Sequence, residues 1–210
     1  MFIRPCWRPR SEGEMLEFIE QYSWALLVTN GDDGPFATNL PMVLDRSGSR
    51  PKLVSHLSRA NSHARQLMQS TTPSLIIFEG PVSYVTASWY PRRQMPSTYY
   101  YTAVHCYGRV QFQNAEGLRE SLEVLTSQME TPLNDGWRTG EIPESEITRR
   151  LPAILGFEME IERIEGKFKL GQDEPKGDAL AVADRLLERD VADDRLLAGL
   201  IRSYNEDRTD

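Results

Sequence analysis

The stretch from Thr98 to Gln113 alternates between two kinds of side chain, and no other feature of the chain constrains its fold as strongly. One parity carries a row of aromatic and titratable groups: Tyr99, Tyr101, Ala103, His105, Tyr107 and Arg109. The other parity carries a set typical of a core face: Tyr100, Thr102, Val104, Cys106, Gly108, Val110 and Phe112. Because successive side chains of a β-strand point to opposite faces, this pattern predicts one long strand that is half buried.

The other strands are separated mostly by turn signals, such as Gly31-Asp-Asp-Gly34. The patterns predict strands over 24–29, 36–44 (bent at Pro41), 52–57, 74–78, 82–89, 155–164 and 166–172, with a tight break at Gly80-Pro81. They predict helices over 12–22, from a cap at Ser58 to about 69, and over 115–129, 144–151, 177–189 and 193–203. Strands joined by hairpins favour an α+β chain that is mainly antiparallel, a small barrel with helical decoration, over a parallel α/β sheet. We expect one barrel domain over 1–190, with a helix and a frayed tail over 191–210.

Composition excludes several classes of function. The net charge of −7 over 210 residues argues against a nucleic-acid footprint, which needs a basic surface. We find no apolar run long enough for a bilayer, and the first residues are too polar for a signal peptide. Cys6 and Cys106 form neither a disulfide framework nor a zinc site. We therefore expect a cytoplasmic protein with reduced thiols.

The stretch from Ser55 to Leu67 holds His56 and His63, with Arg59 between them. On a helix that starts after Ser58, Arg59 and His63 are spaced i and i+4 and share a face. An imidazole beside a guanidinium suits a metal in a planar macrocycle whose carboxylates need a cation. The alternative is a solvated histidine on an exposed helix face, and on spacing alone that alternative is the stronger one.

Basic pairs form a second group of candidates. Lys167 and Lys169 alternate along a predicted strand, so they lie on one side of it, and Arg92-Arg93 sit in a loop after an aromatic segment. Either pair can clamp a phosphate or a carboxylate, while solvated surface charge is the ordinary alternative.

Four stretches together resemble one family, the PaiB-type FMN-binding transcriptional regulators. They are Gly80-Pro-Val-Ser-Tyr-Val-Thr-Ala-Ser-Trp-Tyr90, Thr98-Tyr-Tyr-Tyr-Thr-Ala-Val-His-Cys-Tyr-Gly108, His56-Leu-Ser-Arg-Ala-Asn61 and Gly166-Lys-Phe-Lys-Leu-Gly-Gln172. The resemblance runs from Met1 to about Leu187. It implies a split β-barrel of the flavin-reductase and pyridoxamine-oxidase type, built as a homodimer with sites at the subunit interface.

Three departures from the family pattern are informative. The family usually reads Thr-Trp-Asn-Tyr where this chain has Thr98-Tyr-Tyr-Tyr101, and Ser-Gln-Asn where it has Gly171-Gln-Asp173. The helix after His56-Leu-Ser-Arg-Ala-Asn61 usually carries Trp where this chain has His63. A PaiB-like chain with these changes is similar to the piperazate synthases. These are haem-dependent enzymes that close N5-hydroxy-L-ornithine into L-piperazic acid by forming an N–N bond, in nonribosomal-peptide biosynthesis.

This resemblance implies roles for particular residues. It implies haem b as the cofactor, with FMN as the alternative, and His63 as the axial iron ligand, with His56 as the second choice. Arg59, Arg92, Arg93 and Lys167 are expected to meet the haem propionates, and Trp89 to lie against the cofactor. Tyr99, Tyr101 or His105 is expected to be the acid or base.

Two other functions remain open from the sequence. One is an FMN-binding, PaiB-like regulator, although the chain lacks a recognition helix and is acidic. The other is a haem-degrading or haem-storing split-barrel protein. Among partners, we expect the small-molecule substrate and a second copy of the chain, with no membrane and no nucleic acid.

Overall fold

The computed structural model describes residues 1–31, 34–133, 135–189 and 191–209. They form two compact units. Unit 1 comprises Met1–Phe18, Glu79–Val104 and Glu165–Asp210, and unit 2 comprises Ile19–Phe78 and His105–Ile164. The chain therefore passes between the units several times, and each unit has its own core.

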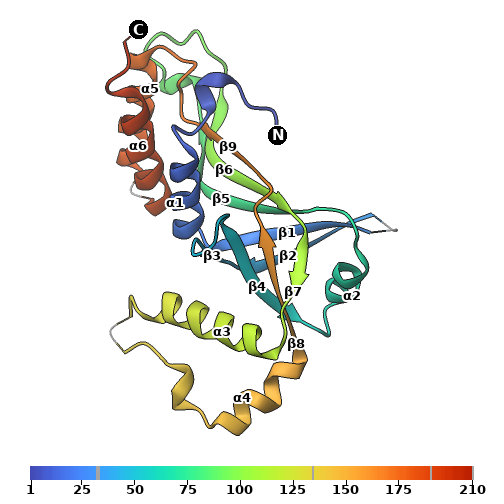
Figure 1. Ribbon diagram of the computed structural model, residues 1–210. Helices are drawn as coiled ribbons and strands as arrows, with labels where there is room; N and C mark the ends of the chain where they lie inside the picture. Colours follow the sequence, from blue (N-terminus) through green and yellow to red (C-terminus); the bar gives the residue numbers. More distant parts are fainter. Residues whose placement is uncertain (32–33, 134, 190, 210) are drawn as a thin grey trace. The chain divides into compact units, whose positions relative to one another are not determined.

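Runs of two to four strands are separated by helices along the chain (Figure 1). The strands are β1 Trp24–Gly31, β2 Gly34–Pro41, β3 Val43–Asp45, β4 Lys52–Ser58, β5 Ser74–Val85, β6 Thr98–Gly108, β7 Val110–Phe112, β8 Ile154–Glu160 and β9 Arg163–Lys169. The α-helices are α1 Glu12–Gln21, α2 Ser62–Gln69, α3 Ala115–Glu130, α4 Glu144–Arg150, α5 Lys176–Glu188 and α6 Ala192–Asn205. Short 3-10 helices are η1 Pro5–Trp7, η2 Ala87–Trp89, η3 Thr139–Glu141 and η4 Leu151–Ala153.

Unit 2 is built on antiparallel pairs of strands. β1 pairs with β2 on one side and with the first part of β5 on the other, so that Ala25 lies opposite Leu40 and Phe78. A four-stranded sheet follows the order β3-β4-β8-β7, in which His56 lies opposite Gly156. Leucine, valine and phenylalanine side chains between these strands form the core of the unit.

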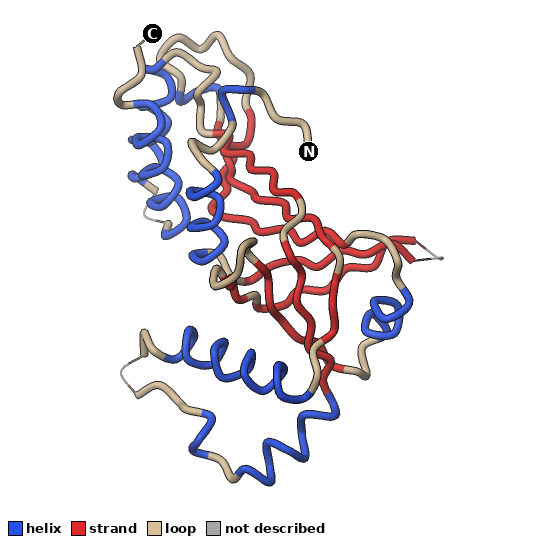
Figure 2. The backbone as a smooth tube through the Cα atoms, in the orientation of Figure 1, coloured by secondary structure: helices blue, strands red, loops and turns tan. Residues whose placement is uncertain are grey.

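Unit 1 joins strands to a pair of helices. The latter part of β5 is followed in the sheet by β6 and then β9. Figure 2 shows α5 and α6 as neighbouring helices, and their apolar faces are fully buried through residues such as Val182 and Ile201. Tyr100 and Phe168 contribute the aromatic part of this core. The prediction of a mixed α+β chain with antiparallel sheets is confirmed.

The alternation predicted for the long strand is confirmed for most of β6, but Ala103 on the opposite parity is buried, and Phe112, predicted on the core face, is exposed. Tyr100, Val104 and Cys106 are fully buried, while Tyr99 on the opposite parity is 56% exposed. The predicted length is wrong, because β6 ends at Gly108 and β7 begins again at Val110. A Cβ at position 108 would lie 2.1 Å from the carbonyl oxygen of Glu160, so only glycine allows this close approach of the backbones.

Other strand boundaries also differ from the prediction. The break expected at Gly80-Pro81 is wrong, because β5 runs through both residues and ends at Val85, before η2. A Cβ on Gly80 would clash with Phe18 and Thr102, so this glycine serves packing rather than a turn. The strands expected over 155–164 and 166–172 are instead β8 and β9, separated at residues 161–162.

The start of α2 was also predicted incorrectly. Ser58 still belongs to β4, and Asn61 caps the helix by accepting a hydrogen bond of 2.9 Å from the backbone N–H of His63. Asn is among the best N-cap residues. Asn61 therefore caps the helix in place of Ser58, and the helix begins about one turn later than predicted. Arg59 therefore precedes α2, and it does not share a helix face with His63.

The C-terminal segment is held by hydrogen bonds. Asn205 is buried, and its side-chain amide donates to the carbonyl oxygens of Leu170 and Ile201. Arg208 in turn donates to the carbonyl oxygen of Glu174. The boundary expected at residue 190 stays a prediction, and residues 32–33 of the hairpin turn predicted at Gly31–Gly34 lie outside the described residues.

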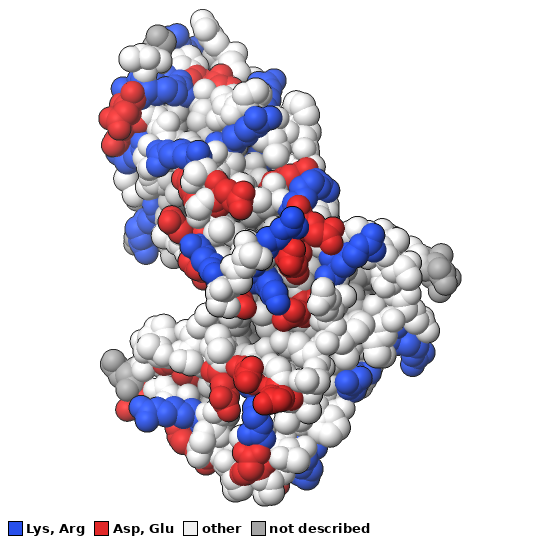
Figure 3. All heavy atoms as spheres, in the orientation of Figure 1, with Lys and Arg blue, Asp and Glu red and all other residues white. Residues whose placement is uncertain are grey.

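The surface carries both signs of charge in both units on the face that Figure 3 shows. None of the helices in the described residues combines the length and the apolar character needed to cross a membrane. Cys6 is exposed and Cys106 is buried, and both are free thiols. Burial raises the pKa of the Cys106 thiol to about 12, which keeps it protonated and unreactive.

Candidate functional site

His63 lies fully buried in unit 2, on the first turn of α2. Its Nε2 atom is 2.8 Å from the hydroxyl of Thr29 on β1, and its Nδ1 atom is 2.7 Å from the hydroxyl of Thr38 on β2. The ring of Phe36 covers one side of the imidazole at 4.9 Å between centroids. The histidine thus ties α2 to the β1–β2 hairpin through both of its nitrogens.

The charge state of His63 follows from this burial. Desolvation lowers the pKa of His63 below its ordinary value, so the ring is neutral near pH 7. A neutral imidazole carries one N–H and one lone pair, so one threonine hydroxyl accepts from the ring and the other donates to it. The lone pair that a metal would need is therefore already engaged by a threonine hydroxyl.

Gln66 lies one turn after His63. Both its Oε1 and Nε2 atoms are buried and have no hydrogen-bond partner among the described residues. A Cβ built on Gly31 would lie 2.5 Å from Nε2 of Gln66, so this amide also sits against the end of β1. The face of α2 that covers the hairpin is therefore polar, and it is incompletely satisfied at Gln66.

The other candidates in unit 2 lie on different elements. His56 is on β4, and burial lowers its pKa. The Nε atom of Arg59 donates to the carbonyl oxygen of Ile154 at 3.0 Å, which directs this guanidinium toward the start of β8. The ring of His105 on β6 lies 6.4 Å from that of Tyr107.

Unit 1 brings together two of the predicted residues, Tyr101 and Lys167. The ammonium nitrogen of Lys167 lies 5.2 Å from the ring centroid of Tyr101 and 4.8 Å from that of Trp7. Lys169 is on the same side of β9, with its ammonium 5.5 Å from the Trp7 ring, as the alternation along the strand predicted. Lysine ammoniums over aromatic faces are attracted by the ring quadrupole.

A carboxylate completes this cation–aromatic cluster, which we define as Arg4, Trp7, Tyr101, Lys167, Lys169 and Asp173. One oxygen of Asp173 accepts a hydrogen bond of 3.1 Å from Nε1 of Trp7, and the other accepts one of 3.1 Å from Arg4. The cluster is assembled from η1, β6, β9 and the turn after β9. Sequence reasoning missed Arg4 and Trp7, because they lie more than 160 residues from Asp173 and follow no motif.

The remaining candidates in unit 1 occupy other places. Trp89 lies in η2, with the Arg189 guanidinium 5.9 Å from its ring centroid. The backbone N–H of Arg92 donates to Asp178 at 3.4 Å, and Arg93 has a left-handed φ of 49°. The Tyr99 ring packs edge-on against Tyr84, at 5.5 Å between centroids.

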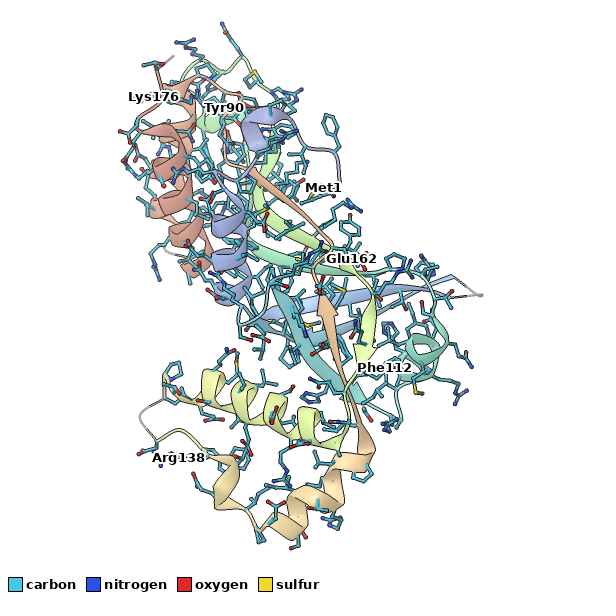
Figure 4. The ribbon with its side chains drawn as sticks, viewed as in Figure 1. Met1, Tyr90, Phe112, Arg138, Glu162 and Lys176 are labelled. Atoms are coloured by element: carbon cyan, nitrogen blue, oxygen red, sulfur yellow. The ribbon has the colours of Figure 1, made fainter. Side chains whose placement is uncertain are left out.

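Two tyrosines of unit 1 are buried, Tyr90 directly after η2 and Tyr100 on β6. The hydroxyls of Tyr90, labelled in Figure 4, and Tyr100 are 3.4 Å apart. Burial raises the pKa of both phenols, so both stay protonated at physiological pH. They act as a polar element of the core, and Gly171 closes over Tyr100 with a left-handed φ of 84°.

A cleft of about 560 Å³ opens in unit 2 between the four-stranded sheet and α3. Its lining includes Asp45, Gln111, Glu120 and Phe112, the last labelled in Figure 4. None of the site residues predicted from sequence is among the described residues that line it.

Residues 1–163 match the family described as "Putative FMN-binding domain". The chain belongs to this family. A curated relative, the protease synthase and sporulation protein PAI 2 of Bacillus subtilis (strain 168), is 25% identical over 201 residues and spans 96% of each chain. The family membership predicted from the four stretches is therefore confirmed.

Solved structures of other proteins have a fold similar to that of this chain. The FAD and haem binding protein from Mycobacterium smegmatis aligns with a TM-score of 0.59 at 18% identity, over 78% of this chain and 74% of that one. The flavocytochrome Anf3 from Azotobacter vinelandii aligns with a TM-score of 0.59 at 13% identity, over 78% and 69%. At these identities, the likeness concerns the fold, which is that of flavin- and haem-binding split-barrel proteins.

The contacts of His63 show whether this residue, as placed, could bind iron. Its neutral form is the ligating form, but both nitrogens are held by threonine hydroxyls and the ring has no exposed surface. As placed, the residue does not fit an axial position. Iron could be bound only if one threonine hydrogen bond were exchanged for the metal.

Proposed function

We propose that this family member binds haem b and closes N5-hydroxy-L-ornithine into L-piperazic acid. The observation that supports the proposal is a neutral histidine, His63, on the first turn of α2, at the position where the resemblance expects tryptophan. A buried histidine supplies a ligand type suited to haem iron, and tryptophan, which the family usually has there, does not.

Cofactor binding at His63 requires a local rearrangement. Thr38 is half-buried on β2, while Thr29 is buried on β1, so the hydrogen bond to Thr38 is the one nearer solvent. Giving up one neutral hydrogen bond costs about 1 kcal/mol, and the buried ring must also be uncovered before a planar macrocycle can reach it. The proposal therefore includes an exchange at His63, and no chemical step is assigned to the metal.

The proposed reaction is balanced without an external oxidant or reductant. The N–O bond of the hydroxylamine breaks, an N–N bond forms to the α-amine, and the oxygen leaves as water. The chain must then bind the substrate carboxylate and move protons. Lys167 and Tyr101 lie beside each other in unit 1, and we propose that Lys167 binds a carboxylate and that Tyr101 donates or accepts a proton.

The absorption spectrum of the purified chain tests the cofactor assignment. Haem gives a Soret band, and flavin gives the two bands of oxidised isoalloxazine. A Soret band that is lost in His63→Ala and kept in His56→Ala supports the proposal. A Soret band unchanged in His63→Ala contradicts the ligand assignment, and flavin bands without a Soret band contradict the haem assignment.

The second candidate function is FMN binding without the cyclisation. It is favoured by the family description. Under either function we propose that two copies of the chain pair, as the resemblance to the split-barrel family implies. The haem-degrading function is distinguished by its product, because it would consume the porphyrin.

A further inference from the structure

The cation–aromatic cluster of unit 1 holds more positive than negative charge. Arg4, Lys167 and Lys169 contribute three cations, and Asp173 contributes the one carboxylate that is hydrogen-bonded within it. Burial lowers the pKa of Lys169, Lys167 and Arg4 act in the same direction, and the carboxylates of Asp173 and Glu174 oppose them. Such a cluster attracts an anion, because an additional negative charge reduces the repulsion among its cations.

The hydrogen-bond donors of the cluster differ in whether they already have an acceptor. Arg4 and the indole N–H of Trp7 are both engaged by Asp173, and Lys169 is hydrogen-bonded to the hydroxyl of Thr98. Lys167 contacts only the aromatic faces of Phe2, Trp7 and Tyr101, and no carboxylate of the described chain lies within ion-pair distance of it. One cation is therefore left to meet a ligand.

We propose that Asp173 is a resident counter-ion that sets the charge of the ligand this cluster accepts. It leaves room at Lys167 for one carboxylate, and it rejects the phosphate dianion of a nucleotide such as FMN. A phosphate needs several donors for its three oxygens, and here Asp173 occupies the indole N–H of Trp7 and one N–H of Arg4 and repels a second anion. The inference concerns ligand selection alone, so it does not depend on the proposed cyclisation.

The test compares FMN with riboflavin, which carries the same ring without the phosphate. Binding of each to the full chain is followed by quenching of flavin fluorescence. We expect Asp173→Asn to bind FMN at least about tenfold more tightly than the unaltered chain, with riboflavin binding unchanged. The gain in FMN binding should shrink with added salt and disappear in the double variant Asp173→Asn, Lys167→Gln.

The control is Asp184→Asn, which removes the same charge from the exposed face of α5, where Asp184 pairs with Arg202. It should leave FMN binding unchanged. Thermal unfolding checks that Asp173→Asn is folded, and the asparagine oxygen can still accept from Trp7 or Arg4. The proposal is overturned by no gain in FMN binding, by an equal gain for riboflavin, or by an equal gain in Asp184→Asn.

Discussion

Thr29 and His63 are joined across 34 residues of sequence by a hydrogen bond of 2.8 Å between Oγ1 and Nε2. Both residues are buried, so the bond is shielded from water. Together with the bond to Thr38, it makes His63 a support for the β1–β2 hairpin. The residue proposed to bind iron therefore stabilises the chain in the absence of the cofactor, and the two roles can be measured separately.

His63→Ala should destabilise the cofactor-free chain by about 2–4 kcal/mol. The substitution leaves a cavity and deprives the hydroxyls of Thr29 and Thr38 of a partner. Urea denaturation measures the change, and the matched control is Lys52→Ala on β4, whose ion pair with Glu158 is half-exposed. Equal and small losses in the two variants would show that His63 contributes little to stability.

Stability should fall as the pH is lowered through the range of the buried histidines. Burial lowers the pKa of His63 and His56, so the folded chain binds fewer protons than the unfolded chain near pH 6. The stabilisation is complete above the unfolded pKa of about 6.5 and is lost as the pH falls toward the folded pKa. In His63→Asn, the loss of stability between about pH 7.5 and 5.5 should be smaller than in the unaltered chain. An identical pH dependence would contradict the assignment of a buried neutral ring.

Tyr101→Phe should lower turnover about a hundredfold if the phenol moves the proton. The haem spectrum should stay unchanged, because the substitution removes only the hydroxyl. Tyr99→Phe is the matched variant on the same strand, and its ring packs against Tyr84 rather than Lys167. Equal rates in both variants would remove Tyr101 from the proposed reaction.

Gly171→Ala should destabilise the chain by about 2 kcal/mol or more. The residue has a φ of 84°, and an added Cβ would lie 2.7 Å from the Tyr100 hydroxyl. Gly177→Ala is the control, because nothing lies within 4 Å of its added Cβ, and it should be neutral or stabilising by up to about 1 kcal/mol. Thermal unfolding of the two variants gives the comparison, and a stable Gly171→Ala would show that the turn after β9 relaxes.

Local periodicity predicted much of the fold. The alternation of Tyr99, Tyr100 and Tyr101 placed one parity in the core, and the spacing of Lys167 and Lys169 placed both on one side of β9. The ends of the strands were predicted less well. Gly80 was interpreted as part of a turn and Gly108 as an ordinary strand residue, because the sequence alone does not show which segments pack against them. Each is glycine because another segment approaches closely, which depends on tertiary packing.

The candidate site was predictable only in part, for the same reason. The pairing of Lys167 with Tyr101 follows from two recognisable strands, but the contacts of Asp173 with Arg4 and Trp7 join the N-terminal segment to the turn after β9. The cap at Asn61 also changed the geometry around His63, since this asparagine, three residues after Ser58, caps the helix in place of the predicted serine. Short polar residues in succession do not reveal which of them begins a helix.

Turnover of N5-hydroxy-L-ornithine by the haem-loaded chain tests the central proposal most directly. Product mass is measured after incubation with haem-loaded, FMN-loaded and cofactor-free protein. The account predicts a cyclic product one water lighter than the substrate, formed only by the haem-loaded chain and without added reductant. Formation of no such product by a chain that shows a full Soret band would contradict it.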